Sequence, residues 1–127
     1  SNADGQNALT RQIREYILRN LGDDSLSPAS IAAAHFISLR YLYTLFAKEG
    51  QTVSAWIRAK RLSHICRDLA DPVYAEKTVS WIAGRWGLHD AAHFSRLFKA
   101  EYGMSPTAFR RRQLQQSEER PAMACAA

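Results

Sequence analysis

Apolar residues recur along most of this chain at intervals of three and four positions, the spacing that places them on one face of an α-helix. No stretch shows the strict alternation of apolar and polar residues that a half-buried strand requires. The first clear stripe runs from Leu9 to Leu21, and Gly22 ends it. The pattern therefore predicts an all-α fold.

Residues that start and stop helices divide this pattern into seven helices. The six that follow the first stripe are expected to begin at Ser27-Pro28, Ser38, Thr52, Thr78, Asp90 and Ser105-Pro106, where a side-chain oxygen can cap the first turn. The fourth helix, at about residues 53–70, is expected to connect the helices on either side of it. Its length of roughly eighteen residues corresponds to about 27 Å.

Two stretches of the chain repeat one plan, which is a short helix, a tight turn, a second helix and a closing glycine. The matched positions are Ile31, Ala32, Ile37, Leu42, Phe46 and Gly50 in the first copy and Ile82, Ala83, Leu88, Phe94, Phe98 and Gly103 in the second. The small alanine lets the second helix approach closely, as a helix-turn-helix motif requires. The first unit spans about residues 9–50 and the second about residues 79–112.

The outward face of each second helix distinguishes this repeat from two unrelated helical hairpins with similar stripes. Small residues, hydrogen-bonding residues and arginines gather on that face, and these suit a helix that lies against base edges in a major groove. They are Arg40, Tyr43, Thr44, Ala47 and Lys48 in the first unit and Ala92, His93, Arg96 and Lys99 in the second.

Charge and composition agree with this interpretation. The 127 residues carry a formal net charge of +5, and the basic residues concentrate in two blocks, residues 40–67 and 85–112. A basic balance permits nucleic-acid binding without requiring it. The length favours one compact domain with its own core rather than two. Neither a signal peptide nor a membrane span is evident, so we expect a cytoplasmic protein that makes no membrane contact.

The ends of the chain and its cysteines add little chemistry. Residues 1–3 look like the remnant of a cleaved affinity tag, so the domain is placed at residues 4–112. Residues 113–127 continue no apolar stripe and are expected to form a disordered tail. Cys66 and Cys125 show no metal-binding or redox spacing and are expected to be free thiols. Trp56, Trp81 and Trp86 lie among the apolar stripes and are expected to pack in the core.

The second unit closely resembles the signature of the AraC/XylS family of bacterial regulators. The residues that carry the resemblance are Val79-Ser80-Trp81-Ile82-Ala83, Gly87-Leu88, Phe94-Ser95-Arg96-Leu97-Phe98-Lys99, Gly103, Ser105-Pro106 and Phe109-Arg110. A weaker match includes Arg61-Leu62, and the whole extends over roughly Leu9 to Arg112. The resemblance implies a homeodomain-like domain in which the fourth helix joins two helix-turn-helix units that enter successive major grooves and regulate transcription.

The resemblance also assigns roles by position. It implies base-reading by Arg40, Tyr43, Thr44, Ala92, His93 and Arg96, and phosphate contacts by Ser38, Lys48, Ser95, Lys99 and Arg110. Phe36 departs from the family because this turn position is glycine in many members. The partners implied are double-stranded operator or promoter DNA, RNA polymerase and an N-terminal sensor or dimerisation domain outside this chain. No cofactor or metal is implied.

Other functions have weaker support from the residues. Similar tandem units accompany DNA-repair methyltransferases, but Cys66 has no activating motif beside it and no catalytic triad, phosphate loop or paired carboxylate is visible, so we expect no enzyme. His89 and His93 have a spacing that can bind zinc but lack further ligands. A helical protein-interaction module without operator binding remains open. Such a module would show weak salt dependence, whereas phosphate contacts would make binding fall steeply with salt.

Overall fold

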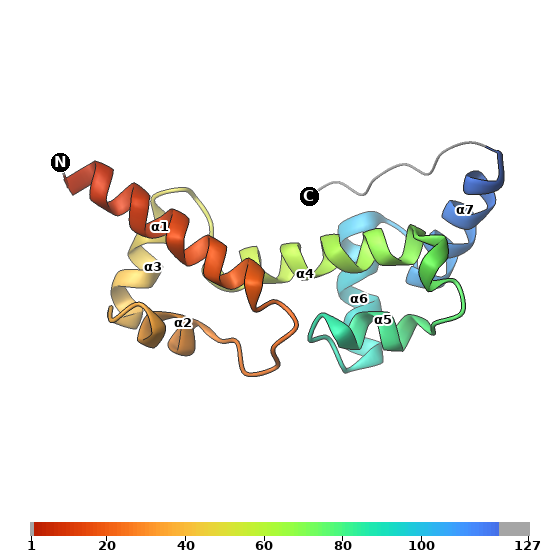
Figure 1. Cartoon of the computed structure of the whole chain (residues 1–127), viewed down its shortest axis with the longest axis horizontal. Helices are drawn as coiled ribbons and strands as arrows, with labels where there is room; N and C mark the ends of the chain where they lie inside the picture. Colours follow the sequence, from red (N-terminus) through yellow and green to blue (C-terminus); the bar gives the residue numbers. More distant parts are fainter. Residues whose placement is uncertain (1, 120–127) are drawn as a thin grey trace. The chain divides into compact units, whose positions relative to one another are not determined.

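The computed structural model describes residues 2–119, and every regular element in that range is helical (Figure 1). The elements in chain order are α1 (Asn2–Arg19), α2 (Pro28–Ala34), α3 (Leu39–Ala47), α4 (Val53–Ala70), the 3-10 turn η1 (Pro72–Tyr74), α5 (Val79–Arg85), α6 (Ala91–Tyr102) and α7 (Pro106–Glu119). The expected all-α, seven-helix fold is confirmed over the described residues. None of the helices in residues 2–119 is long and apolar enough to cross a membrane.

The helices begin where the capping residues predict. Ser27, Ser38, Thr78 and Asp90 each accept the backbone N–H of the residue three positions later. Ser27 also forms a reciprocal capping box with Ser30. The short η1 turn, which Asp71 caps, was not expected, because three residues are too few to produce an apolar periodicity.

The described chain divides into two compact units, one ending at Lys60 and the other beginning at Arg61, both within α4. The expectation of one domain over residues 4–112 stays a prediction. In the first unit α1, α2 and α3 contact one another and bury Ile17, Ile31 and Phe46 completely. A unit of about sixty residues can hold a core of its own when its helices are short and amphipathic.

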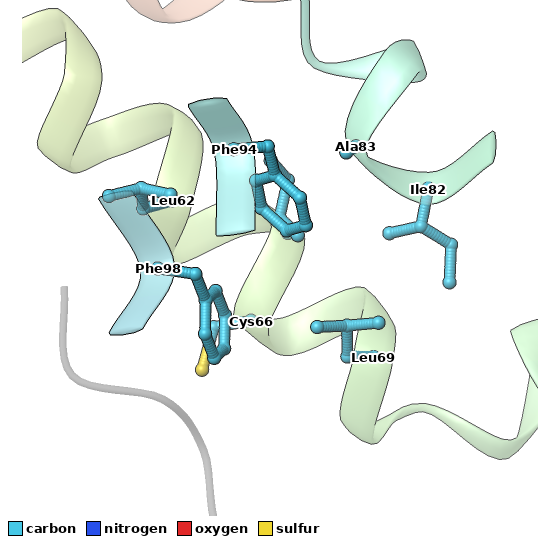
Figure 2. Close-up of a cluster of buried hydrophobic side chains, with 8 residues drawn as sticks. Leu62, Cys66, Leu69, Ile82, Ala83, Phe94 and Phe98 are labelled. Atoms are coloured by element: carbon cyan, nitrogen blue, oxygen red, sulfur yellow. The ribbon is translucent and has the colours of Figure 1, made fainter. Parts of the chain in front are cut away.

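The second unit has a separate core, shown in Figure 2. Leu62, Cys66 and Leu69 from α4 meet Ile82 and Ala83 from α5 and Phe94 and Phe98 from α6. Ala83 is 1% exposed, so its small side chain lies at the helix contact as the repeat predicted.

Cys66 departs from the sequence expectation. It lies 1% exposed in the core of the second unit and is disulfide-bonded, so the expected free thiol is wrong at this position. The residues around Cys66 show no spacing that would reveal such a bond. Cys125 lies outside the described residues.

The turns of the two helix-turn-helix units have the same hydrogen bonds. Ile37 donates its backbone N–H to the carbonyl of Ala32 over 3.1 Å, and Leu88 donates to Ala83 over 3.1 Å. The residue before each donor adopts the left-handed conformation, with φ of 57° at Phe36 and 86° at Gly87. The departure at Phe36 therefore leaves the turn geometry intact.

The surroundings explain why the two turns use different residues. Phe36 is 96% exposed, so its side chain extends into open solvent. A Cβ atom at Gly87 would instead lie 2.9 Å from Cζ of Arg61 on α4. Left-handed backbone disfavours any side chain, but only in the second turn would a side chain also have to displace Arg61.

The last helix extends further than expected. α7 continues through residues 113–119, so the prediction of disorder is wrong there, and the remainder of the predicted tail lies outside the described residues. Arg, Gln, Leu and Glu are strong helix formers, and no glycine or proline interrupts them before Pro121. Intrinsic propensity extends this helix without an apolar stripe.

The different surroundings of Phe36 and Gly87 predict that substitutions at these two turn positions change the free energy of unfolding by different amounts. Phe36→Gly removes left-handed strain and adds unfolded-state entropy, so the free energy of unfolding should stay within about 1 kcal/mol of the original. Gly87→Ala adds strain and displaces Arg61, so it should lose more than about 1 kcal/mol. Urea unfolding followed by circular dichroism measures both. Equal losses for the two variants would contradict this account.

Candidate nucleic-acid interface

The outward face of α3 carries the residues that were expected to read bases in the first unit. Arg40, Tyr43 and Thr44 are all exposed, whereas Leu42 and Phe46 on the opposite face are completely buried. The Thr44 hydroxyl donates to the Arg40 carbonyl over 3.0 Å, which leaves its lone pairs available as acceptors. The helix thus presents a polar face with one half-exposed aromatic ring.

The matching face of α6 has a different composition. Ala92, His93 and Arg96 are exposed, and Phe94 and Phe98 hold the other face in the core. This face offers a methyl group, an imidazole and a guanidinium. The two units therefore share a backbone plan and differ in the chemistry that they present.

Asp90 caps the N-terminus of α6, the helix that carries the second face. Its carboxylate accepts the His93 backbone N–H over 3.0 Å, which lowers the pKa of Asp90 below its ordinary value. Arg96 contributes a smaller electrostatic effect in the same direction. The cap aligns the first turn of α6, where Ala92 and His93 lie.

The residues expected to contact phosphates have more varied surroundings. Ser95 and Lys99 are exposed on α6, while exposed Ser38 uses its hydroxyl oxygen to cap α3. Lys48, at the end of α3, donates a hydrogen bond to Gln6 of α1. Arg110 makes two hydrogen bonds within the protein, because its Nη2 donates to the carbonyls of Tyr74 (2.6 Å) and Ala75 (3.0 Å).

Some basic residues make ring contacts and ion pairs within the protein itself. In the first unit, Cζ of Arg14 lies 4.7 Å from the ring centre of Phe46 and 4.6 Å from that of Trp56. Arg14 also pairs with Glu49. A cation held in this way stabilises the unit, and Glu49 already offsets its charge.

In the second unit Arg85 has the corresponding structural role. Its Nη1 donates to Oδ2 of Asp68 over 3.1 Å, and the same oxygen accepts the indole N–H of Trp86 over 2.7 Å. The guanidinium also lies 4.8 Å from the ring centre of Tyr74, and a hydrogen bond with Tyr74 raises the pKa of Arg85. This network joins α4, η1 and α5.

Trp81 does not have the core position that the sequence analysis assigned to it. Its side chain is 44% exposed, whereas Trp56 and Trp86 are partly buried. The apolar stripe of α5 consists of Val79, Ile82 and Ala83 followed by Trp86, and Trp81 lies outside that spacing. The helical period alone could have identified Trp81 as a surface residue.

No group of three or more histidine, cysteine or carboxylate side chains within residues 2–119 could hold a metal ion. The candidate interface residues lie on the outward face of α3 in the first unit and on the outward face of α6 in the second.

Comparisons with known proteins agree with this geometry. Residues 31–112 match the family described as Helix-turn-helix domain. Transcriptional activator NphR of Rhodococcus is 39% identical over 103 residues, which are 81% of this chain and 30% of that protein. Transcriptional activator RhrA of Rhizobium meliloti is 31% identical over 99 residues, which are 78% of this chain and 31% of that protein. The chain therefore spans less than a third of the length of these two relatives.

Solved structures share the fold. The C-terminal domain of AraT, a response regulator from Geobacillus stearothermophilus, has a TM-score of 0.75 and 27% identity, covering 82% of this chain and 84% of that one. A transcriptional regulator from Chromobacterium violaceum, described as containing an AraC-type DNA-binding domain, has a TM-score of 0.76 and 22% identity. The match covers 88% of this chain and 97% of that one.

The Asp90 cap predicts a specific pH response. Because the folded pKa is lowered, its stabilisation is present above the ordinary value of 3.8 and is lost as the pH falls through the folded pKa. Asp90→Asn keeps a capping oxygen that does not titrate. The melting temperature of the original chain should therefore exceed that of Asp90→Asn at neutral pH, and this difference should shrink as the pH falls below 3.8. A difference that does not change with pH would show that the carboxylate charge contributes nothing.

Proposed function

The chain belongs to the AraC type of helix-turn-helix domains, and we propose that it is the DNA-reading part of a bacterial transcription regulator, in which α3 and α6 each read one half of a two-part site. Regulation of transcription through DNA binding is the function of this family, which is a class of DNA-binding domains rather than of enzymes.

The main support for the proposal is that the same helix-turn-helix arrangement occurs twice with two different outward faces. Both units have the same turn hydrogen bond and a capped second helix. Both also keep two large side chains of that helix in a core, which leaves the opposite face exposed. A repeat under purely structural constraint would not need arginine and hydrogen-bonding residues on both exposed faces.

The residues on each exposed face can contact particular groups on the DNA bases. Arg40 in the first unit and Arg96 in the second have planar forks that can grip O6 and N7 of guanine. Tyr43 and Thr44 supply hydroxyl groups beside Arg40, and His93 supplies an imidazole beside Arg96. Ala92 offers a methyl group that can pack on a thymine methyl.

Ser38, Lys48, Ser95 and Lys99 are proposed to contact the sugar-phosphate backbone around these faces. Such contacts fix the register of the protein on the duplex and carry no sequence information. Arg110 is proposed to act mainly as an anchor, because Nη2 of its guanidinium already holds two backbone carbonyls.

The remaining partners are proposed from the family. The relatives NphR and RhrA, which are described as transcriptional activators, are about three times as long as the matched region. We propose that the natural protein joins this domain to a sensor or dimerisation domain, acts through RNA polymerase and works in the cytoplasm.

The proposed roles on α6 predict that two cations behave differently. Arg96→Ala should cost about 1–3 kcal/mol on the preferred duplex and should remove discrimination at one base position, because a bidentate contact is lost. Lys99→Ala should weaken all sequences about equally and reduce the slope of log affinity against log salt by about one. Binding isotherms on matched and mismatched duplexes at several salt concentrations measure both effects. If Arg96→Ala left every mismatch penalty unchanged, Arg96 would be a backbone contact.

The two-part site predicts a dependence on helical phase. The preferred duplex can be selected from a random pool, and the half-sites, about one helical turn apart, can then be separated by five additional base pairs. This insertion rotates one half-site to the opposite side of the duplex, so one chain can no longer engage both and affinity should approach that of a single half-site. An insertion of ten base pairs distinguishes the effect of phase from that of distance. Affinity that survives the five-base-pair insertion would exclude simultaneous reading by the two units.

A further inference from the structure

An exposed surface of aromatic and basic side chains lies at the entrance to the second helix-turn-helix unit. It consists of Tyr74 from η1, Lys77 from the following loop, and Trp81 and Arg85 from α5, and we call it the α5 entrance surface. Nζ of Lys77 lies 4.7 Å from the ring centre of Trp81, and Cζ of Arg85 lies 5.6 Å from the same ring. The rings of Tyr74 and Trp81 are 6.1 Å apart.

The two cations on this surface differ in how they are neutralised. Arg85 pairs with Asp68, whereas Lys77 forms no ion pair with any carboxylate in residues 2–119. The Lys77 ammonium is held instead by the indole ring of Trp81, which leaves its N–H donors available. The indole N–H of Trp81 likewise has no acceptor in the described part of the chain.

The segment that carries Lys77 is held firmly. Arg110 of α7 donates to the carbonyls of Tyr74 and Ala75, and Asp71 caps the η1 turn through the Val73 backbone N–H. These contacts fix the backbone just before Lys77, so less conformational entropy is lost when an anion binds. Arg110 would therefore support the phosphate contact by holding this backbone, without contacting the phosphate itself.

The internal repeat shows that this surface is particular to the second unit. The residues matched to Lys77 and Trp81 in the first copy are Leu26, which is 9% exposed, and Ser30, which is part of the α2 capping box. The fold itself therefore requires neither a cation nor an exposed indole at these positions.

In helix-turn-helix proteins the first helix of the motif crosses the DNA backbone while the second enters the groove. Lys77 and Trp81 flank the beginning of that first helix in the second unit, α5. We propose that the side chains of Lys77 and Trp81 together bind one backbone phosphate beside the half-site read by α6. The proposal rests on the DNA-reading function proposed above and adds a contact that anchors one half of the site more strongly than the other.

The test uses the duplex selected by the original chain and the same duplex with single mismatches in either half-site. Lys77→Gln should reduce the slope of log affinity against log salt by about one and should weaken all of these duplexes equally. Lys77→Arg should restore the slope, because it keeps the cation. Trp81→Phe keeps a ring under Lys77 and removes the indole N–H, so it should lower affinity with little change in slope.

Arg11→Gln is the matched control. Arg11 is an exposed residue of α1, the helix that precedes α2 and α3, and the substitution removes the same charge. Its slope should remain near that of the original chain. If Lys77→Gln and Arg11→Gln gave equal slopes while the original chain bound its duplex with steep salt dependence, the phosphate contact would be excluded and the surface would instead fit a protein partner. If the original chain bound no duplex at all, the proposed function and this inference would fail together.

Discussion

The left-handed residue between the two helices of each unit is the constraint on which the rest of the structure depends. It reverses the chain within a few residues, so the carbonyl of Ala32 or Ala83 can accept the N–H of the residue beyond the turn. The second helix then begins at its cap with its apolar stripe directed at the first. Because that stripe must be buried, the opposite face must be exposed, and the residues proposed to read bases acquire their position from packing rather than from any contact of their own.

Most of this arrangement could be predicted from the sequence because it depends on local chemistry. Capping residues such as Ser38 and Asp90, the helical period and the duplicated pattern all act within a few positions. The features that differ from the sequence expectations depend on other information. The length of α7 arises from helix propensity without an apolar stripe, and the disulfide bond of Cys66 leaves no signal in the residues around it. Trp81 lies on the surface of α5 because it falls outside the helical period of the apolar stripe, although its hydrophobic character favours burial.

The candidate site shows the limits of net charge as evidence for nucleic-acid binding. Arg14 and Arg85 lie against aromatic rings and are paired with carboxylates, and Arg110 holds a turn, so part of the basic total stabilises the protein itself. The charge that can act on DNA is what remains on exposed faces without an internal partner. This distinction needs side-chain contacts, so the sequence could indicate the outward faces of α3 and α6 but could not tell which cations have internal partners.

The difference between the outward faces of the two repeated units affects how such a domain would bind DNA. The two units share the turn and the caps, but their faces differ, with Arg40, Tyr43 and Thr44 on one helix and Ala92, His93 and Arg96 on the other. If both faces were identical, exchanging the two half-sites of a duplex would leave the base contacts unchanged. Unlike faces make that exchange cost free energy, because each unit would then meet the bases that suit the other. Under the proposed function, the difference between the two faces therefore sets which unit lies on which half-site, and with it the side of the site on which the rest of the protein lies.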